Sequence, residues 1–297
     1  MIEYVMPYFR PPSEAKSFIL QATIGCSHNK CTYCAMYRRD EQKFRMRPTD
    51  EIKQIIDSAA ENPGFTRVFI GDGNALVMPQ KKLTEMMQYV MERCPQVERI
   101  SMYANIGDIL RKGVDNLKEL KKLGLQMVYI GFESGDEVVL ERIQKGANFA
   151  QHIEACKMLK EVEIINSAMV LLGVGGVERS EEHGVATGKL LTATDPEYVG
   201  ALSLQIRPGA PIYNEAMEGK FQLPSKFQMI RELELIVENT TLTDGYFFSN
   251  HISNYLPIKA KFPEDKPRVL KEIRRVLNER DESMLRPDYY RDVINQY

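Results

Sequence analysis

The sequence of 297 residues has few of the features that mark membrane, secreted or nucleic-acid-binding proteins. No stretch approaches the run of about eighteen apolar residues that crosses a bilayer. The first residues carry Glu3, Arg10 and two prolines where a signal peptide has an apolar core, so we expect no signal peptide. A formal net charge of -2 gives no overall attraction to nucleic acid or to a membrane surface, and we expect neither as a partner.

Cysteine is scarce, with five residues in the chain, which argues against a secreted disulfide scaffold and for a reducing cytoplasm. Three of the five, Cys26, Cys31 and Cys34, share one short loop, and thiolates are soft ligands for iron–sulfur clusters, zinc or copper(I). No fourth cysteine lies nearby, although closed zinc sites and ferredoxin clusters normally take four protein ligands. The pattern favours a cluster with one iron open to an outside ligand. A structural zinc site completed by His28 or by a distant cysteine is the alternative.

The loop at residues 23–37 resembles the cluster loop of the radical S-adenosylmethionine (radical SAM) enzymes. The usual spacing in that family is three and then two residues between cysteines, whereas this chain has four and then two. The resemblance implies that Cys26, Cys31 and Cys34 hold a [4Fe–4S] cluster whose open iron chelates S-adenosylmethionine. An electron from the cluster would cleave that molecule to a 5′-deoxyadenosyl radical, which abstracts hydrogen from a substrate. Such an open cluster is oxygen-sensitive, so anaerobic chemistry is expected.

The rest of the chain alternates buried strand patterns with helical patterns, which predicts a parallel sheet covered by helices. Strands are predicted at residues 17–25, 66–70, 99–105, 127–130, 167–174 and 198–206, and Ser180 is predicted to cap the helix that begins there. Right-handed crossovers would curl six such units into a partial barrel, and the family resemblance implies the same α/β fold, a partial (β/α)6 TIM-like barrel.

We expect three parts in the chain. Residues 1–14 form an N-terminal segment, residues 15–213 the radical SAM core, and residues 214–297 a helical or irregular C-terminal subdomain that closes the barrel. Helices are predicted at 226–239 and 267–278 in this last part. No internal repeat beyond the β/α unit occurs.

Barrels of this type carry their functional groups at the C-terminal ends of the strands. The second strand ends at Gly71, Asp72 and Gly73, where the family has a glycine-rich stretch whose carbonyls accept hydrogen bonds from the methionyl ammonium. Asp72 adds charge to that contact or only fixes a tight turn. Asn105 ends the third strand on the same rim.

The sequence GFESG at residues 131–135 is similar to a segment of the branch that holds methylthiotransferases, elongator-type enzymes and oxygen-independent coproporphyrinogen oxidases. The resemblance places Glu133 and Ser134 against the ribose or the ammonium of S-adenosylmethionine, since a carboxylate accepts two hydrogen bonds from a diol. The alternative is a carboxylate paired with a nearby Arg or Lys for structure.

Two further pairs are candidate cofactor contacts. Residues 204–213 resemble the ending of the family's sixth strand. Because Gln205 and Arg207 alternate with Leu204 and Ile206 along the predicted strand, both would point into the barrel, and Arg207 would engage a carboxylate bidentately. Tyr33 and Met36 flank Cys34, where the family places a surface against adenine; ordinary loop packing is the alternative.

A surplus of cations lies within and after the cysteine loop, at Lys30, Arg38, Arg39, Lys43, Arg45 and Arg47. Beside an active site this surplus would favour an anionic small-molecule substrate or docking of an acidic electron donor such as flavodoxin or ferredoxin. A solvated loop is the alternative.

The C-terminal part offers His251 and Tyr255 as candidate proton or hydrogen donors on a segment that covers the barrel mouth. A structural histidine is the alternative there. His152 and His183 fall on helices and are interpreted as structural, and Cys94 and Cys156 fit buried helical positions.

The sequence therefore predicts a single-cluster radical SAM enzyme, because neither room nor cysteines remain for the extra N-terminal cluster domain of methylthiotransferases. The competing hypotheses are a non-catalytic iron–sulfur or zinc protein, such as a redox sensor, and an S-adenosylmethionine-dependent group transferase.

Overall fold

The computed structural model describes residues 3–288 and divides the chain into two compact units. Within the described residues, the first unit holds 3–29, 36–130 and 154–166, and the second holds 30–35, 131–153 and 167–288. One eight-stranded sheet has the order β1-β4-β5-β6-β7-β8-β9-β10. Because its first six strands follow one another in chain order with helices between them, the predicted α/β fold with partial-barrel topology is confirmed.

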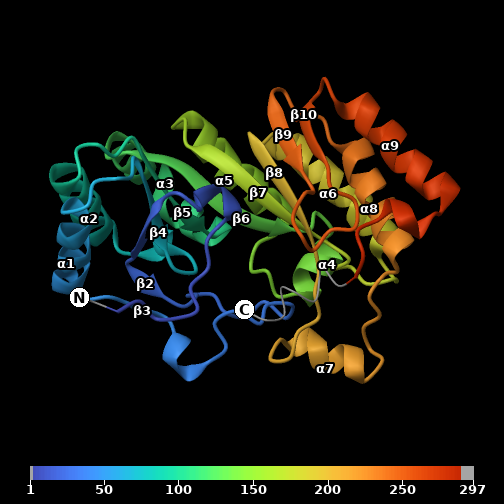
Figure 1. Ribbon diagram of the computed structural model, residues 1–297, viewed down its shortest axis with the longest axis horizontal. Helices are drawn as coiled ribbons and strands as arrows, with labels where there is room; N and C mark the ends of the chain where they lie inside the picture. The colour runs from blue at the N-terminus through green and yellow to red at the C-terminus, as the bar shows by residue number, and fades with distance from the viewer. Residues whose placement is uncertain (1–2, 289–297) are drawn as a thin grey trace. The chain divides into compact units, whose positions relative to one another are not determined.

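In the first unit, β1 (Phe18–Gln21), β4 (Arg67–Gly71) and β5 (Arg99–Ala104) run parallel, and β5 pairs in the same sense with β6 (Leu125–Glu133). Helices α1 (Thr49–Ala60) and α2 (Gln80–Arg93) lie side by side, as Figure 1 shows, with α3 (Ile106–Lys122) next in the chain. Met86 and Met87 of α2 are buried, so the methionine-rich face of this helix belongs to the core.

The strand predicted at 17–25 is two strands. After β1 the chain turns at Ala22 and enters β2 (Thr23–Ile24), which pairs with β3 (Arg45–Met46) in a separate antiparallel ribbon. At Gly25 the φ angle is +74°, and a Cβ there would collide with the carbonyl oxygen of Gln42. Only glycine fits this close approach at the entrance to the cysteine loop.

In the second unit, β7 (Ile165–Leu172) pairs in parallel with β8 (Tyr198–Ser203), and β8 pairs in parallel with β9 (Gly245–Phe248). The sequence predicted the sixth strand to reach residue 206, but it ends at Ser203. Helices α4 (Glu137–Arg142), α5 (Phe149–Glu161), α6 (Ser180–Thr194) and α7 (Pro211–Met217) connect these strands, α5 being shared with the first unit.

The C-terminal part contains both predicted helices, α8 (Lys226–Asn239) and α9 (Lys266–Glu279). It also adds β9 and the antiparallel β10 (Lys259–Phe262) to the sheet beside β8, with α9 outside β10 (Figure 1). The sequence predicted only helical or irregular structure in residues 214–297 and did not predict these strands, because each has only four residues and a polar segment lies between them.

Helices α6 and α8 approach each other closely at two glycines. A Cβ on Gly188 would lie 2.6 Å from the carbonyl oxygen of Ile236, and one on Gly184 would lie 2.9 Å from Cβ of Leu235. The predicted capping by Ser180 is wrong: Arg179 occupies the N-cap position, and the Ser180 hydroxyl donates to Glu232.

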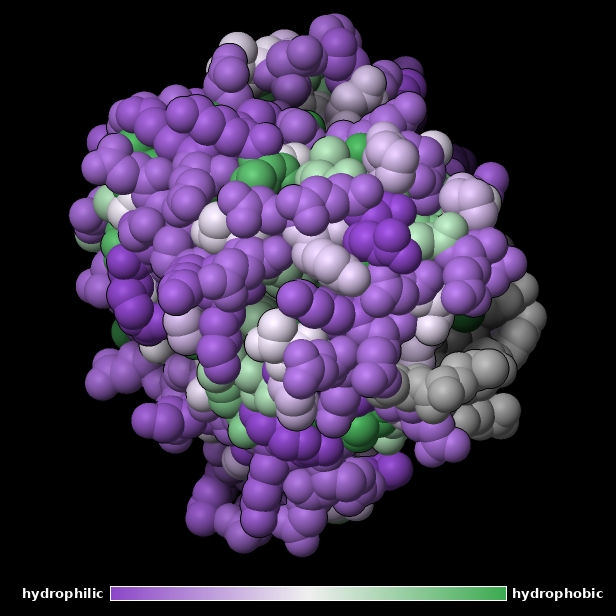
Figure 2. Space-filling view, turned by 90° about the vertical axis from the view of Figure 1, so that its left-hand side faces the viewer, coloured by the Kyte–Doolittle hydropathy of each residue, from purple (hydrophilic) through white to green (hydrophobic). Residues whose placement is uncertain are grey.

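Among the described residues, no helix is both long and apolar enough to cross a bilayer. The face over α1 and α2 is covered mostly by hydrophilic residues with small, separate apolar areas between them (Figure 2).

Candidate functional site

The loop with three cysteines contributes to both units. Cys26 follows β2 in the first unit, whereas Cys31 and Cys34 belong to the second, and all three thiols are partly exposed. Within residues 3–288, no three or more His, Cys, Asp or Glu side chains lie close enough together to hold a metal ion.

In the first unit the backbone at Cys26 is packed against the turn after β4. A Cβ on Gly73 would collide with the carbonyl oxygen of Gly25 and lie 2.7 Å from Cα of Cys26, and the φ angle of Gly73 is +48°. A residue with a side chain cannot be placed here without moving the cysteine backbone.

In the second unit Cys31 and Cys34 lie on one turn, closed by a 3.3 Å hydrogen bond from N–H of Cys34 to the carbonyl of Cys31. Thr32 between them donates from its N–H to the carbonyl of Ile143 (3.0 Å) and accepts from N–H of Ile212 (2.9 Å). Two backbone bonds thus fix this turn to the end of α4 and the start of α7.

Tyr33, on the same turn, is bonded to Glu133 at the end of β6. Burial, and secondarily the charges of Glu133, Cys31 and Cys34, hold the pKa of the Tyr33 phenol well above its usual value. Nζ of Lys145 donates to Oε1 of Glu133 at 3.1 Å, and both side chains are almost buried. Gly131 leaves the space that this carboxylate occupies, since a Cβ there would lie 2.8 Å from Nζ of Lys145.

Asp72 lies buried in the first unit with its carboxylate turned toward protein groups. The Tyr37 hydroxyl donates to Oδ1 at 2.5 Å, and the Gln21 amide donates to Oδ2 at 3.3 Å. The Tyr37 oxygen also accepts from N–H of Gly73 at 3.2 Å. Burial raises the pKa of Asp72, and the hydrogen bond from Tyr37 opposes that rise.

The next residue, Asn74, also contacts the cysteine loop within the first unit. Its Oδ1 accepts from N–H of Ser27 at 3.1 Å, and its amide donates to Asp108 at 2.5 Å. Asn105 is half-buried at the N-cap of α3 with no side-chain capping bond, and Met36 is exposed.

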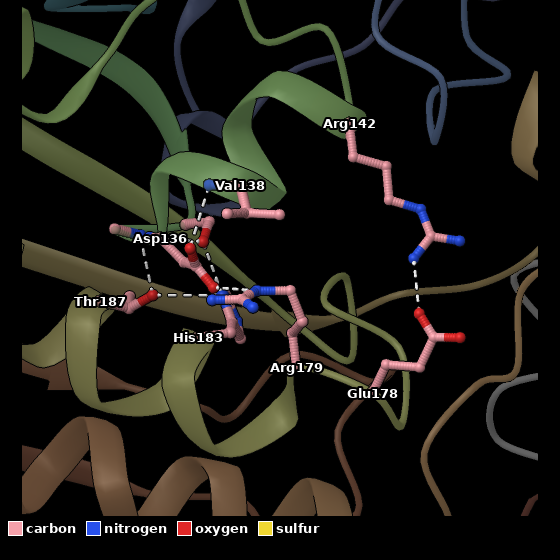
Figure 3. A network of polar contacts seen from close by, with 9 residues as sticks. Asp136, Val138, Arg142, Glu178, Arg179, His183 and Thr187 are labelled. Carbon is pink, nitrogen blue, oxygen red and sulfur yellow. Dashed lines mark hydrogen bonds and ion pairs between the residues drawn. The ribbon is translucent and has the colours of Figure 1, made fainter.

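Ser134 is fully buried, and its hydroxyl is engaged by protein groups. Its Oγ lies 2.7 Å from Nδ1 of His183 and accepts from N–H of Asp136 at 3.0 Å. Asp136 accepts from Arg179 at 2.7 Å, and N–H of Gly135 donates to Thr187 at 2.9 Å. Figure 3 shows this network between α4 and α6, with the ion pair of Arg142 and Glu178 to one side.

Gln205 and Arg207 follow the end of β8 and lie close to each other, since Arg207 donates to Oε1 of Gln205 at 2.7 Å. Partial burial lowers the pKa of the Arg207 guanidinium. The strand ends before these residues, so the alternation used to place both side chains inside the barrel does not extend to them.

His251 and Tyr255 lie on the segment between β9 and β10. Nδ1 of His251 is 2.8 Å from the hydroxyl of Ser253, which itself accepts from N–H of Ser203 at 3.1 Å. Burial, with the nearby Arg286 charge, lowers the pKa of His251. The Tyr255 ring is buried, with Nζ of Lys226 5.9 Å from its centroid.

The remaining cysteines and histidines occupy interior positions. Cys94 and Cys156 are buried, as predicted. Burial lowers the pKa of His152 to about 4, and its Nδ1 lies 2.7 Å from the carbonyl of Asn148. In the basic segment after the cysteines, Arg39, Lys43 and Arg45 are exposed.

Two residues that the sequence did not mark contact candidate site residues: Tyr37 and Lys145. A third, Glu232, accepts from N–H of Gly173 directly after β7. Lys145 lies twelve residues after Glu133, beyond the segment at residues 131–135 that resembles the family. Tyr37 follows Cys34 by three residues, so a position beside the cysteines was available as a signal. No signal marked Glu232, because a glutamate on a helix is normally solvent-exposed.

Solved structures of other proteins have a similar fold. Coproporphyrinogen III oxidase from Escherichia coli aligns with a TM-score of 0.56 at 15% identity, covering 75% of this chain and 51% of that one. Methylornithine synthase aligns with a TM-score of 0.52 at 19% identity, covering 76% of this chain and 63% of that one.

In sequence, the threonylcarbamoyladenosine tRNA methylthiotransferase of Rickettsia prowazekii is 24% identical over 274 residues, which cover 83% of this chain and 61% of that protein. The chain spans less than two thirds of the length of such curated relatives. The family model of the radical SAM superfamily matches residues 20–187, more than half of the chain. The protein therefore belongs to the radical SAM superfamily, whose members use a [4Fe–4S] cluster and S-adenosylmethionine.

Proposed function

We propose that Cys26, Cys31 and Cys34 ligate a [4Fe–4S] cluster and that the protein uses S-adenosylmethionine to abstract hydrogen from a small-molecule substrate. The observation that carries the proposal is the packing around the three partly exposed thiols. Gly73 leaves no side chain between its turn and the Cys26 backbone, and Thr32 fixes the Cys31–Cys34 turn. Three soft thiolates fit an iron–sulfur cluster. When bound, the cluster supplies the electron for reductive cleavage of S-adenosylmethionine.

The first unit contributes backbone groups to cofactor binding in this proposal. Gly71 and Gly73 present carbonyl oxygens to the methionyl ammonium, as expected from the family resemblance. Since Asp72 is bonded to Tyr37 and Gln21, its role is to hold this turn, and its charge contributes only at longer range. Asn105 and Met36 complete this set of candidate contacts.

The second unit contributes Glu133, which has acceptor capacity beyond its bonds to Tyr33 and Lys145. Its carboxylate accepts from the ribose hydroxyls, while Lys145 pairs with it and Tyr33 packs beside adenine. Ser134 contributes by its position, because its hydroxyl is bonded to His183.

The substrate is anionic in this proposal, which the surplus of cations around the cysteine loop favours. Gln205 and Arg207 are candidate cofactor contacts: the guanidinium of Arg207 provides two parallel donors for a carboxylate, and Gln205 orients it through their shared hydrogen bond. His251 or Tyr255, on the covering segment within residues 214–297, would donate a proton or hydrogen atom to the product radical site.

An acidic one-electron donor, such as flavodoxin or ferredoxin, is the partner proposed for the exposed cations Arg39, Lys43 and Arg45. The oxygen sensitivity of an open cluster fits a reducing cytoplasmic setting. These residues lie in the loop directly after the cysteines, so a donor bound there would approach the cluster.

The test is anaerobic reconstitution with iron and sulfide, followed by S-adenosylmethionine and dithionite. The proposal expects 5′-deoxyadenosine from wild-type protein and none from the Cys26→Ala, Cys31→Ala and Cys34→Ala variants. Methylthioadenosine as the product would instead indicate a group transferase, the second candidate, which the methylthiotransferase relative favours. Absence of both products would contradict the proposal.

A further inference from the structure

Glu232 on α8 is a fully buried carboxylate that joins two elements of the second unit. Oε1 accepts from N–H of Gly173 at 2.6 Å, and Oε2 accepts from the hydroxyl of Ser180 at 2.7 Å. Gly173 follows the last residue of β7, and Ser180 is the first residue of α6. One side chain on α8 therefore holds both ends of the β7–α6 connection.

His183 extends these contacts to the end of β6. Oγ of Ser134, which accepts from N–H of Asp136, lies within hydrogen-bonding distance of Nδ1 of His183 at 2.7 Å. On the other side of the ring, Nε2 of His183 lies 3.3 Å from Oε1 of Glu232. That distance permits electrostatic attraction, although the geometry is not that of a hydrogen bond.

Close packing of α6 on α8 makes this arrangement possible. Gly184, next to His183, has no side chain between the helices, and a Cβ there would lie 3.2 Å from the carbonyl oxygen of Glu232 itself. The two helices thus bring the imidazole and the carboxylate together in the interior, where both side chains are fully buried.

Fold stability alone does not require these polar groups. Apolar residues of matching shape can replace a buried polar pair with little loss of stability, whereas a buried hydrogen-bonded network specifies one geometry. The geometry specified here is that of Ser134 and Gly173, which lie at the ends of adjacent strands β6 and β7.

We propose that Glu232, acting through His183 and Ser180, is a positioning residue by which the segment after Tyr213 sets the β6 and β7 ends for S-adenosylmethionine binding. This inference rests on the proposed function, which places the cofactor at those strand ends. Glu232 itself touches neither the cofactor nor the cluster; it acts only on the backbone that forms the site.

The test compares two neighbouring glutamates of α8 in the reconstituted protein. Glu232→Gln should weaken equilibrium binding of S-adenosylmethionine and raise its KM about tenfold, the effect of one lost hydrogen bond, with iron content and kcat unchanged. The matched control is Glu234→Gln, whose carboxylate is also buried but pairs with Arg231 and Arg274. Glu234→Gln should change the thermal stability of the protein without changing its affinity for S-adenosylmethionine.

If Glu232→Gln does not fold, a second variant and its control, with smaller structural effects, test the inference. Ser180→Ala removes one donor to Glu232 and should raise the KM in the same direction by a smaller factor. Thr194→Ala, at the other end of α6, removes a buried hydroxyl that bonds only within the helix and should leave the KM unchanged.

Equal KM values in each variant and its control would overturn the inference. In that outcome the proposed function still stands, provided that wild-type protein yields 5′-deoxyadenosine. Absence of this product from wild-type protein refutes the function itself, so the two failures are distinguishable.

Discussion

Tyr37 donates a 2.5 Å hydrogen bond to Oδ1 of Asp72, and the same phenol oxygen accepts from N–H of Gly73. A residue just after the cysteine loop thus holds the turn that follows β4. Tyr37→Phe should lower the free energy of unfolding by about 2 kcal/mol, because a buried carboxylate loses a donor. Denaturant titration measures this loss.

The control for Tyr37→Phe is Tyr89→Phe. Tyr89 also donates to a carboxylate, that of Asp57, but this pair is only partly buried. Tyr89→Phe should lower the free energy of unfolding by clearly less than Tyr37→Phe does. Equal decreases in the two variants would contradict the importance of the buried pair of Tyr37 and Asp72.

The titration of Asp72 gives a second prediction. Burial raises its pKa in the folded state above the ordinary 3.8, so the folded protein binds the proton more tightly than the unfolded chain does. This contribution to stability is fully present below pH 3.8 and is lost as pH rises through the raised folded-state pKa. The Asp72→Asn variant lacks this titrating group, so its free energy of unfolding should not show this decrease. As pH rises through the window, the variant should therefore become more stable relative to wild type. Denaturation midpoints of cluster-free protein against pH measure it, and parallel curves would refute it.

His152 provides a pH test of opposite sign. Burial lowers its pKa from 6.5 to about 4, so stability is fully present above pH 6.5 and falls as pH drops through 6.5 toward 4. Over that range wild-type protein should lose about 3 kcal/mol that a His152→Leu variant does not lose. A variant with the same acid dependence as wild type would show that another group is responsible.

Gly73→Ala should prevent cluster assembly, because the added methyl group collides with the backbone of Gly25 and presses on Cys26. Iron content after reconstitution measures this effect. Gly113→Ala is the matched control, since Gly113 has a similar φ angle of +68° but no atom within 4 Å of the added Cβ. Loss of iron in both variants would mean that backbone strain, and not contact with Cys26, is the cause.

The proposed donor surface predicts a salt-dependent reduction rate. Changing Arg39, Lys43 and Arg45 to glutamine should slow reduction of the cluster by an acidic flavodoxin about tenfold at low salt, and the difference should vanish at high salt. The control replaces three exposed cations of α9, Arg268, Lys271 and Arg275, in the same way. A rate that is insensitive to salt and to the first set of changes would exclude docking at this loop.

The sequence predicted the fold well where its signals are local. Residues of α8 were predicted with correct bounds, since their apolar spacing is regular, and glycines marked the strand ends. It missed β9 and β10, because strands of four residues pair only through partners distant in the chain. It also placed Ser134 as a cofactor contact without foreseeing His183, whose approach depends on how α6 packs on α8. Contacts of this kind arise from tertiary packing, so no characteristic spacing in the sequence marks them.

The central claim is that three cysteines hold an open [4Fe–4S] cluster. Iron and sulfide analysis of anaerobically reconstituted protein, with electron paramagnetic resonance of the reduced sample, tests it most directly. The account predicts about four irons and four sulfides per chain, a reduced-cluster signal that changes when S-adenosylmethionine is added, and loss of both in the Cys26, Cys31 and Cys34 alanine variants. Zinc bound tightly at these cysteines, or an iron content that survives their replacement, would contradict it.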